Sequence, residues 1–203
     1  MVDTKIENDK LVWPVNWRVS FGAEMPSYDL PLTVSPTGFG IYSFNLMGKA
    51  KINVECAKLL KEKITASGLP FDIFLTAESK AIGLTDELAR LYGHYEYIVL
   101  RKSRKLYMTD PIEIDVKSIT TPEPQKFYLG SEDYDILRGK KIVAVDDVIS
   151  TGGTMRAFFE MARQIGFSIV IIATVLTEGT QWTEYSGVPV VNIDHIPLPG
   201  QIG

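Results

Sequence analysis

The chain has few of the cysteine and histidine residues that form disulfide bonds or bind metal ions. It contains one cysteine and two histidines among 203 residues, which excludes an intrachain disulfide framework and most cysteine-rich metal sites. It also lacks an excess of positive charge, because 21 Lys and Arg stand against 25 Asp and Glu, for a formal net charge of −4. Non-specific binding to nucleic acid or to an acidic membrane needs a basic face. We therefore expect neither nucleic acid nor a membrane as a partner.

Long apolar runs are missing too. The longest, residues 169–176, is far short of the roughly 20 residues that span a bilayer. Residues 1–10 are charged and lack the apolar centre of a signal peptide. What remains is the composition of an ordinary globular domain, 45% hydrophobic and 23% charged. We expect a cytoplasmic protein.

The chain divides into an aperiodic start and a periodic remainder. Residues 1–48 mix aromatic residues with prolines and show no sustained period, which predicts an irregular or short-stranded cap. From Lys51 apolar residues recur at helical spacing, and Gly68 is the expected end of that helix. Beyond it, apolar runs alternate with segments of helical spacing. The expected strands are residues 71–76, 95–100, 142–145, 169–175 and 188–193, and the expected helices cover 84–91 and 155–165.

Continuous apolar strands separated by helices predict an α/β fold with a parallel sheet of about five strands, flanked by helices on both faces. Ligands bind at the carboxyl ends of the strands in such sheets. Between Leu100 and Ile142 the alternation stops, with no amphipathic helix and with candidate strands at 112–116 and 126–129. A long connection of this kind is usually a lid or an arm. We place an arm at about 103–138, within a core of residues 49–203.

Residues 141–154 are the most informative stretch: an apolar strand, two acids, a Thr-Gly-Gly-Thr turn and the start of a helix. Glycines permit a sharp turn and a close approach to a ligand, and unpaired amides with a partial positive charge at a helix start suit a phosphate. Asp146 and Asp147 would repel a phosphate but suit the hydroxyls of a ribose, or Mg²⁺ held on them. The pattern therefore predicts a ribose 5-phosphate ligand. The P-loop and Gly-x-Gly-x-x-Gly patterns are both absent from the sequence.

This stretch resembles the phosphoribosylpyrophosphate (PRPP) motif of type I phosphoribosyltransferases. The resemblance implies that Asp146 and Asp147 hold the ribose hydroxyls of PRPP, with Mg²⁺ near them and held mainly through PRPP and water. It also implies the family fold, with a flexible β-arm and a small hood made from the N-terminal and C-terminal segments. The 5-phosphate would bind Ser150, Thr151, Gly152, Gly153 and Thr154.

Two other segments resemble the adenine and xanthine phosphoribosyltransferases. Residues 77–81, Ala-Glu-Ser-Lys-Ala, stand where those enzymes have a Glu-Ser-Arg/Ser-Gly pyrophosphate loop, with Ala81 in place of the glycine. Residues 101–105 resemble an Arg-Lys-x-x-Lys segment that binds pyrophosphate, partly across a dimer interface. With Asp146 and Asp147, Glu78 completes the expected catalytic set, since it could take a proton from the purine. The expected pyrophosphate contacts are Glu78, Ser79, Lys80, Arg101, Lys102 and Lys105.

The arm and the base pocket depart more from the family pattern. Ser118-Ile119 stands where many members have Ser-Tyr, and Ser150 stands where some purine enzymes have an Asp proposed as a base. The second departure argues against a hypoxanthine–guanine enzyme of the common type. The candidate base contacts are Asn45, Val148, Thr177 and Glu178.

The resemblance implies a purine phosphoribosyltransferase of nucleotide salvage, of the xanthine or adenine type. Such an enzyme transfers the 5-phosphoribosyl group of PRPP to a purine base and releases pyrophosphate, with Mg²⁺ as cofactor and as a homodimer. Two alternatives stay open: a non-catalytic PRPP-binding regulator of the same fold, and a transferase for a non-purine acceptor such as orotate or uracil. The first 48 residues are not basic and lack a three-helix pattern, which counts against a DNA-binding regulator.

Overall fold

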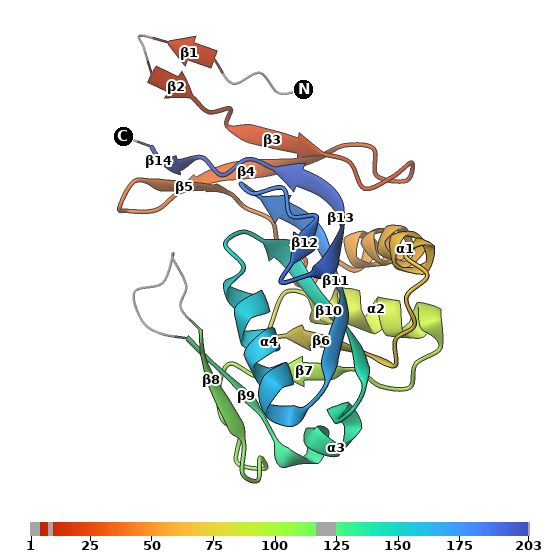
Figure 1. Cartoon of the computed structure of the whole chain (residues 1–203). Helices are drawn as coiled ribbons and strands as arrows, with labels where there is room; N and C mark the ends of the chain where they lie inside the picture. Colours follow the sequence, from red (N-terminus) through yellow and green to blue (C-terminus); the bar gives the residue numbers. More distant parts are fainter. Residues whose placement is uncertain (1–4, 8–9, 117–124, 203) are drawn as a thin grey trace.

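A parallel sheet forms the centre of the computed structural model, which describes residues 5–7, 10–116 and 125–202 (Figure 1). Within these residues the sheet has the strand order β12-β13-β11-β10-β6-β7, and all neighbours are parallel except β12 and β13. The five predicted strands and their parallel pairing are confirmed. The two-residue edge strand β12 was missed, because two residues carry no readable period. The bounds are β6 Ile73–Ala77, β7 Ile98–Leu100, β10 Lys141–Ile149, β11 Ser168–Glu178, β12 Glu184–Tyr185 and β13 Val188–Ile196.

Helices cover both faces of this sheet (Figure 1). The helices α1 (Ala50–Ala66) and α2 (Ile82–Tyr92) pack against one face, and α4 (Gly153–Ile165) packs against the other. Successive residues of a strand point to opposite faces, so Ala144 belongs to the core cluster under α4, whereas Val143 belongs to the one under α1 and α2. This double burial is why the strands are continuous apolar runs.

A second sheet, the hood sheet, lies above the carboxyl ends of the central strands (Figure 1). It has the order β14-β5-β4-β3, so a strand near the C-terminus pairs with strands from the N-terminal segment. The ring of Phe21 lies 5.7 Å from that of Tyr28 and 5.6 Å from that of Phe44, which ties the hood sheet to the core under α1. The division into residues 1–48 and 49–203 stays a prediction. The bounds are β3 Asn16–Val19, β4 Tyr28–Val34, β5 Phe39–Tyr42 and β14 Gly200–Gln201; β1 (Lys5–Glu7) and β2 (Lys10–Val12) form a separate hairpin.

The arm is an antiparallel hairpin of β8 (Ile112–Val116) and β9 (Gln125–Leu129), close to the two predicted strands. The predicted Ser118-Ile119 element lies outside the described residues. After the hairpin come a 3₁₀ turn at Ser131–Asp133 and the one-turn helix α3 (Tyr134–Leu137), neither of which was predicted. One turn is too short to produce a hydrophobic period. Within the described ranges, no helix combines the length and the hydropathy needed to cross a membrane.

Candidate active site

A cavity of about 390 Å³ opens at the carboxyl ends of β6 and β10, below the hood sheet. Parallel strands end at the same edge of a sheet, so the loops that follow β6 and β10 meet there although about 70 residues separate them in sequence. From the core, the cavity is lined by residues 77–80, Lys102, Phe127, residues 146–155 and Glu178. From the hood and the C-terminal segment, it is lined by Phe39, residues 41–44 and Leu198.

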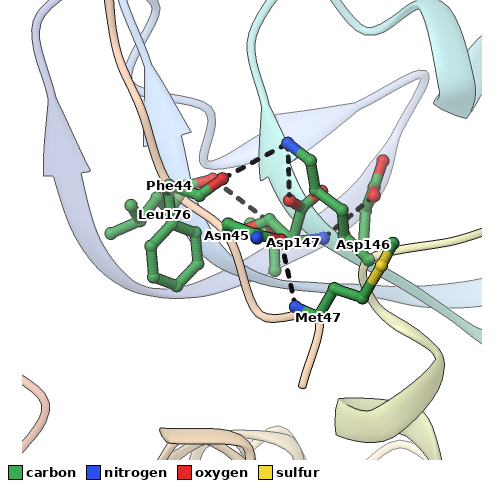
Figure 2. Close-up of polar contacts among 8 residues, drawn as sticks. Phe44, Asn45, Met47, Asp146, Asp147 and Leu176 are labelled. Atoms are coloured by element: carbon green, nitrogen blue, oxygen red, sulfur yellow. Dashed lines mark hydrogen bonds and ion pairs between the residues drawn. The ribbon is translucent and has the colours of Figure 1, made fainter. Parts of the chain in front are cut away.

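The two predicted acids stand side by side at the end of β10 and both line the cavity (Figure 2). The backbone N–H of Asp147 donates to Oδ1 of Asp146 over 2.9 Å. Oδ2 of Asp147 is buried and has no hydrogen-bond partner among the described residues. Its nearest opposite charge, Nζ of Lys80, is 3.5 Å away. A buried carboxylate oxygen without a donor, facing a cavity, is suited to accept a hydrogen bond from a ligand hydroxyl.

Burial, followed by repulsion from Asp147, raises the pKa of Asp146 well above its ordinary value. A side-chain hydrogen bond with Thr154 opposes this shift. Two buried threonines on neighbouring strands hold the backbone on which the acids stand. Oγ1 of Thr76 donates to the carbonyl of Val145 over 2.9 Å, and Oγ1 of Thr174 donates to the carbonyl of Asp147 over 3.2 Å.

The five residues predicted to bind a 5-phosphate, Ser150 to Thr154, all line the cavity. Gly152 has φ +75°, in the left-handed region that favours glycine, and it is the N-cap residue of α4. No side chain of the described residues caps this helix, and its first turn holds no acid. Its leading amides are therefore free to bind an anion, and the helix dipole favours one there.

The loop after β6 lies beside the acid pair, because β6 pairs with β10, and it lines the same cavity. The peptide bond between Glu78 and Ser79 is cis. Ala81, which stands where the resemblance expects glycine, has φ −89°, so this position does not need the positive φ that favours glycine. Nζ of Lys80 donates to the carbonyl of Phe44 over 3.2 Å and so joins this loop to the hood segment.

Of the predicted pyrophosphate residues, Glu78, Ser79, Lys80 and Lys102 line the cavity, but Arg101 and Lys105 do not. Nε of Arg101 lies 2.5 Å from Oε1 of Glu78, and the backbone N–H of Lys102 donates to Oε2 of Glu78 over 2.7 Å. Nζ of Lys105 donates to the hydroxyl of Ser103. Arg101 is therefore engaged with Glu78, beside the cavity wall.

The four candidate base contacts divide into two pairs. Val148 and Glu178 line the cavity, whereas Asn45 and Thr177 do not. Oδ1 of Asn45 accepts the backbone N–H of Met47 over 3.0 Å (Figure 2), and the hydroxyl of Thr177 is buried against Nδ1 of His195 at 2.9 Å. Burial raises the pKa of Glu178, opposed by a hydrogen bond with the side chain of Ser150.

Four hood residues that line the cavity were not predicted from the sequence: Phe39, Ile41, Ser43 and Phe44. The aromatic residues and prolines of the first 48 positions indicated a cap, but they gave no sign of which side chains face the cavity. The pairing of the hood sheet decides this, and it depends on residues near both ends of the chain.

Comparisons with known proteins agree with this geometry. The family model described as phosphoribosyl transferase domain matches residues 49–197. A hypoxanthine/guanine phosphoribosyltransferase of Methanocaldococcus jannaschii is 38% identical over 106 residues, which cover 52% of this chain and 53% of that protein. An adenine phosphoribosyltransferase of Pseudothermotoga lettingae is 34% identical over 103 residues, which cover 50% of this chain and 56% of that protein. The chain thus spans about half the length of these curated relatives.

Solved structures show the same fold. The crystal structure of adenine phosphoribosyltransferase from Thermoanaerobacter pseudethanolicus matches with a TM-score of 0.65 at 18% identity, over 82% of this chain and 95% of that one. The enzyme of that name from Trypanosoma brucei, in complex with AMP, pyrophosphate and ribose-5-phosphate, matches with a TM-score of 0.59 at 18% identity, over 89% of this chain and 76% of that one.

Proposed function

The chain belongs to the phosphoribosyl transferase domain family, and from this premise we propose that it is a purine phosphoribosyltransferase of nucleotide salvage. One observation carries the proposal. The acid pair at the end of β10, the uncapped start of α4 and the loop after β6 line a single cavity. The acids suit the ribose hydroxyls of PRPP as hydrogen-bond acceptors, the uncapped helix start suits the 5-phosphate, and Lys80 in the loop after β6 suits the pyrophosphate.

Each part of PRPP has its own residues in this proposal. Asp146 and Asp147 accept hydrogen bonds from the ribose hydroxyls, and Oδ2 of Asp147 has no hydrogen-bond donor among the described residues. The amides and hydroxyls of residues 150–154 bind the 5-phosphate. Ser79, Lys80 and Lys102 bind the pyrophosphate, so that C1 of the ribose would lie between the 5-phosphate and the pyrophosphate.

In the reaction, a purine ring nitrogen forms a bond to C1 of PRPP while the bond from C1 to the pyrophosphate oxygen breaks. The nitrogen loses its proton to Glu78 or to solvent, since the hydroxyl of Ser150 is not a base at neutral pH. Lys80 and Lys102 stabilise the charge that builds on the leaving pyrophosphate. The chain acts by positioning and by electrostatic stabilisation, without a covalent intermediate.

Mg²⁺ would bind beside the two acids and neutralise charge on the pyrophosphate. Among the residues that the structure describes, no group of three or more acidic, histidine or cysteine side chains could hold a metal ion. Asp146 and Asp147 alone therefore fit an ion that keeps water and substrate oxygens as its other ligands.

A homodimer belongs to the proposal. Leu106 and Tyr107, which follow the basic segment 101–105, expose large apolar side chains. A second copy covering them would bring further basic side chains toward the pyrophosphate. Light scattering after gel filtration gives the mass that tests this part, and a monomer would contradict it.

The base is proposed to be xanthine or adenine. The curated relatives carry hypoxanthine/guanine and adenine names, so the assay includes all four purines, with orotate and uracil. Purified protein with PRPP and Mg²⁺ is assayed for pyrophosphate release with each base. Turnover with a purine supports the proposal. Turnover with orotate or uracil alone, or PRPP binding without turnover, overturns it in favour of a non-purine transferase or a regulator, respectively.

A further inference from the structure

Two aromatic side chains, Trp182 and Tyr185, form hydrogen bonds with the backbone of the proposed phosphate-binding turn, residues 150–153, from outside the cavity. Nε1 of Trp182 donates to the carbonyl of Ser150 over 2.9 Å, and the hydroxyl of Tyr185 donates to the carbonyl of Gly152 over 3.3 Å. Both come from the segment between β11 and β13, more than 30 positions along the chain. Neither ring lines the cavity, so any effect on a ligand passes through the turn.

The geometry of the peptide unit links these contacts to the ligand. In a planar trans peptide the C=O and the following N–H point in opposite directions. A Ser150 carbonyl fixed on Trp182 therefore directs the N–H of Thr151 away from the aromatic pair. The Gly152 carbonyl accepts both the N–H of Arg156, over 2.9 Å, and the hydroxyl of Tyr185, and the two contacts together set the direction of the N–H of Gly153. Thr151 and Gly153 are cavity-lining residues.

Ring packing holds Trp182 and Tyr185 in the positions from which they form these two hydrogen bonds. The Trp182 and Tyr185 ring centroids are 5.4 Å apart, and Tyr185 lies 5.6 Å from Phe159 of α4. A Cβ at position 152 would lie 2.5 Å from Cε2 of Tyr185, so the ring fits against the turn only because residue 152 is glycine. Tyr185 also pairs with Val188 in the sheet, which fixes the segment to the sheet edge.

We propose that Trp182 and Tyr185 are positioning residues that orient the amides of the 150–153 turn toward a phosphate monoester. This inference rests on the proposed function and deepens it at the 5-phosphate. It distinguishes the two anion sites, because the loop after β6 receives no contact from either ring in the hydrogen bonds and ring pairs of the described residues.

The test uses Trp182→Phe and Tyr185→Phe, which remove the donor and keep a ring. Calorimetry measures the binding of ribose 5-phosphate and, separately, of pyrophosphate with Mg²⁺. Loss of one hydrogen bond is worth about 1 kcal/mol, so we expect ribose 5-phosphate to bind about 5-fold more weakly to each variant. Pyrophosphate binding should be unchanged within about 2-fold. Trp13→Phe and Tyr95→Phe are the matched controls and should bind both ligands like the unmodified chain.

The outcomes separate the two proposals. Unchanged ribose 5-phosphate binding in both variants overturns the positioning role, and so does an equal loss of both ligands, which would indicate a general structural effect. An unmodified chain that binds no ribose 5-phosphate overturns it as well. Absence of turnover with every base counts against the proposed function alone, because the contrast between the two ligands does not depend on turnover.

Discussion

Asp146 shows how a residue proposed to bind a ligand can lower the stability of the fold. Its carboxyl is half-buried beside a second acid, and its pKa is raised because burial and Asp147 both disfavour the charged form. A carboxylate that accepts ribose hydroxyls must nonetheless be ionised. The raised pKa therefore predicts a residue that lowers stability at neutral pH.

The first prediction concerns Asp146→Asn. An acid whose pKa is higher in the folded chain contributes stability that is fully present below its unfolded pKa of about 3.9 and is lost as the pH rises through its folded pKa. The neutral amide avoids that loss. We expect a melting temperature about 2–4 °C higher than that of the unmodified chain at pH 7, for a gain of about 1 kcal/mol.

Calorimetric melting at several pH values checks this, and the difference should disappear near pH 4 as the unmodified acid becomes protonated. Glu62→Gln, at an exposed position on α1, serves as the control and should not shift. A lower melting temperature for Asp146→Asn at pH 7 would contradict the expected cost of the buried acid.

Asp147→Asn tests function at the neighbouring position. The amide cannot accept hydrogen bonds at both terminal atoms, so the ribose loses its alignment. We expect turnover to fall on the order of 10²-fold or more, with a melting temperature no lower than that of the unmodified chain, because the repulsion between the two acids is removed. Initial rates of pyrophosphate release give the result, and near-normal kinetics with an intact fold would count against the proposed role.

At the scale of elements, α1 shows how packing of one face holds a helix in place. Its buried face includes Ile52, Cys56 and Leu60, in the core cluster that also contains residues of the hood segment. Tertiary burial supplies most of the stability of such a helix. Cys56, the one cysteine of the chain, reports on that burial, since its pKa is raised by burial to about 12.

We expect the thiol of Cys56 to react with a disulfide reagent only through opening of the fold, because it is fully buried and protonated at pH 8. Leu60→Ala removes a neighbour in the same cluster and should cost about 2–5 kcal/mol. Labelling should then be at least about 10-fold faster, as each 1.4 kcal/mol changes the open population tenfold.

Labelling kinetics in native buffer provide the measurement. Leu69→Ala, at a partly exposed loop position, is the matched control and should label at the unmodified rate. Rapid labelling of the unmodified chain would show that the helix opens independently of the rest of the core.

At the scale of the whole molecule, the two ends of the chain complete the site together. β14 pairs with β5 through Gly200↔Gly40 and Gln201↔Phe39. Phe39 and Ile41 on β5 face the cavity opposite the acid pair. Removal of the chain from Gly200 onward leaves β5 with an unpaired edge while the core strands stay intact.

For this truncated chain we expect the KM for the base to rise several-fold while the KM for PRPP stays within about 2-fold. The reason is that the hood wall loosens whereas the ribose and phosphate contacts come from β10 and α4. Initial-rate kinetics with each substrate varied in turn separate the two constants. Equal changes in both KM values would show that the hood does not act on the base separately.

From the sequence alone, the acid pair and the turn at residues 150–154 could be assigned to one site, and both line the cavity. The nine residues from Asp146 to Thr154 are contiguous, and strand, turn and helix start impose their geometry locally. The five parallel strands were equally readable, because strands buried on both faces must be continuously apolar. These are short-range consequences of residue type and period.

Only the tertiary structure decided which more distant residues join the site. Thr177 and Glu178 are adjacent at the end of β11, and the sequence did not distinguish their roles. Because successive side chains of a strand point to opposite faces, Thr177 contacts His195 whereas Glu178 lines the cavity. The side chain of Asn45 accepts a hydrogen bond within its own turn, from the N–H of Met47, and the guanidinium of Arg101 forms an ion pair with Glu78. The hood side of the cavity forms only when β14, near the C-terminus, pairs with β5. Trp182 contacts the turn because the segment between β11 and β13 packs against it. Such contacts depend on packing between residues far apart in the sequence, so they cannot be predicted from a local pattern of residues.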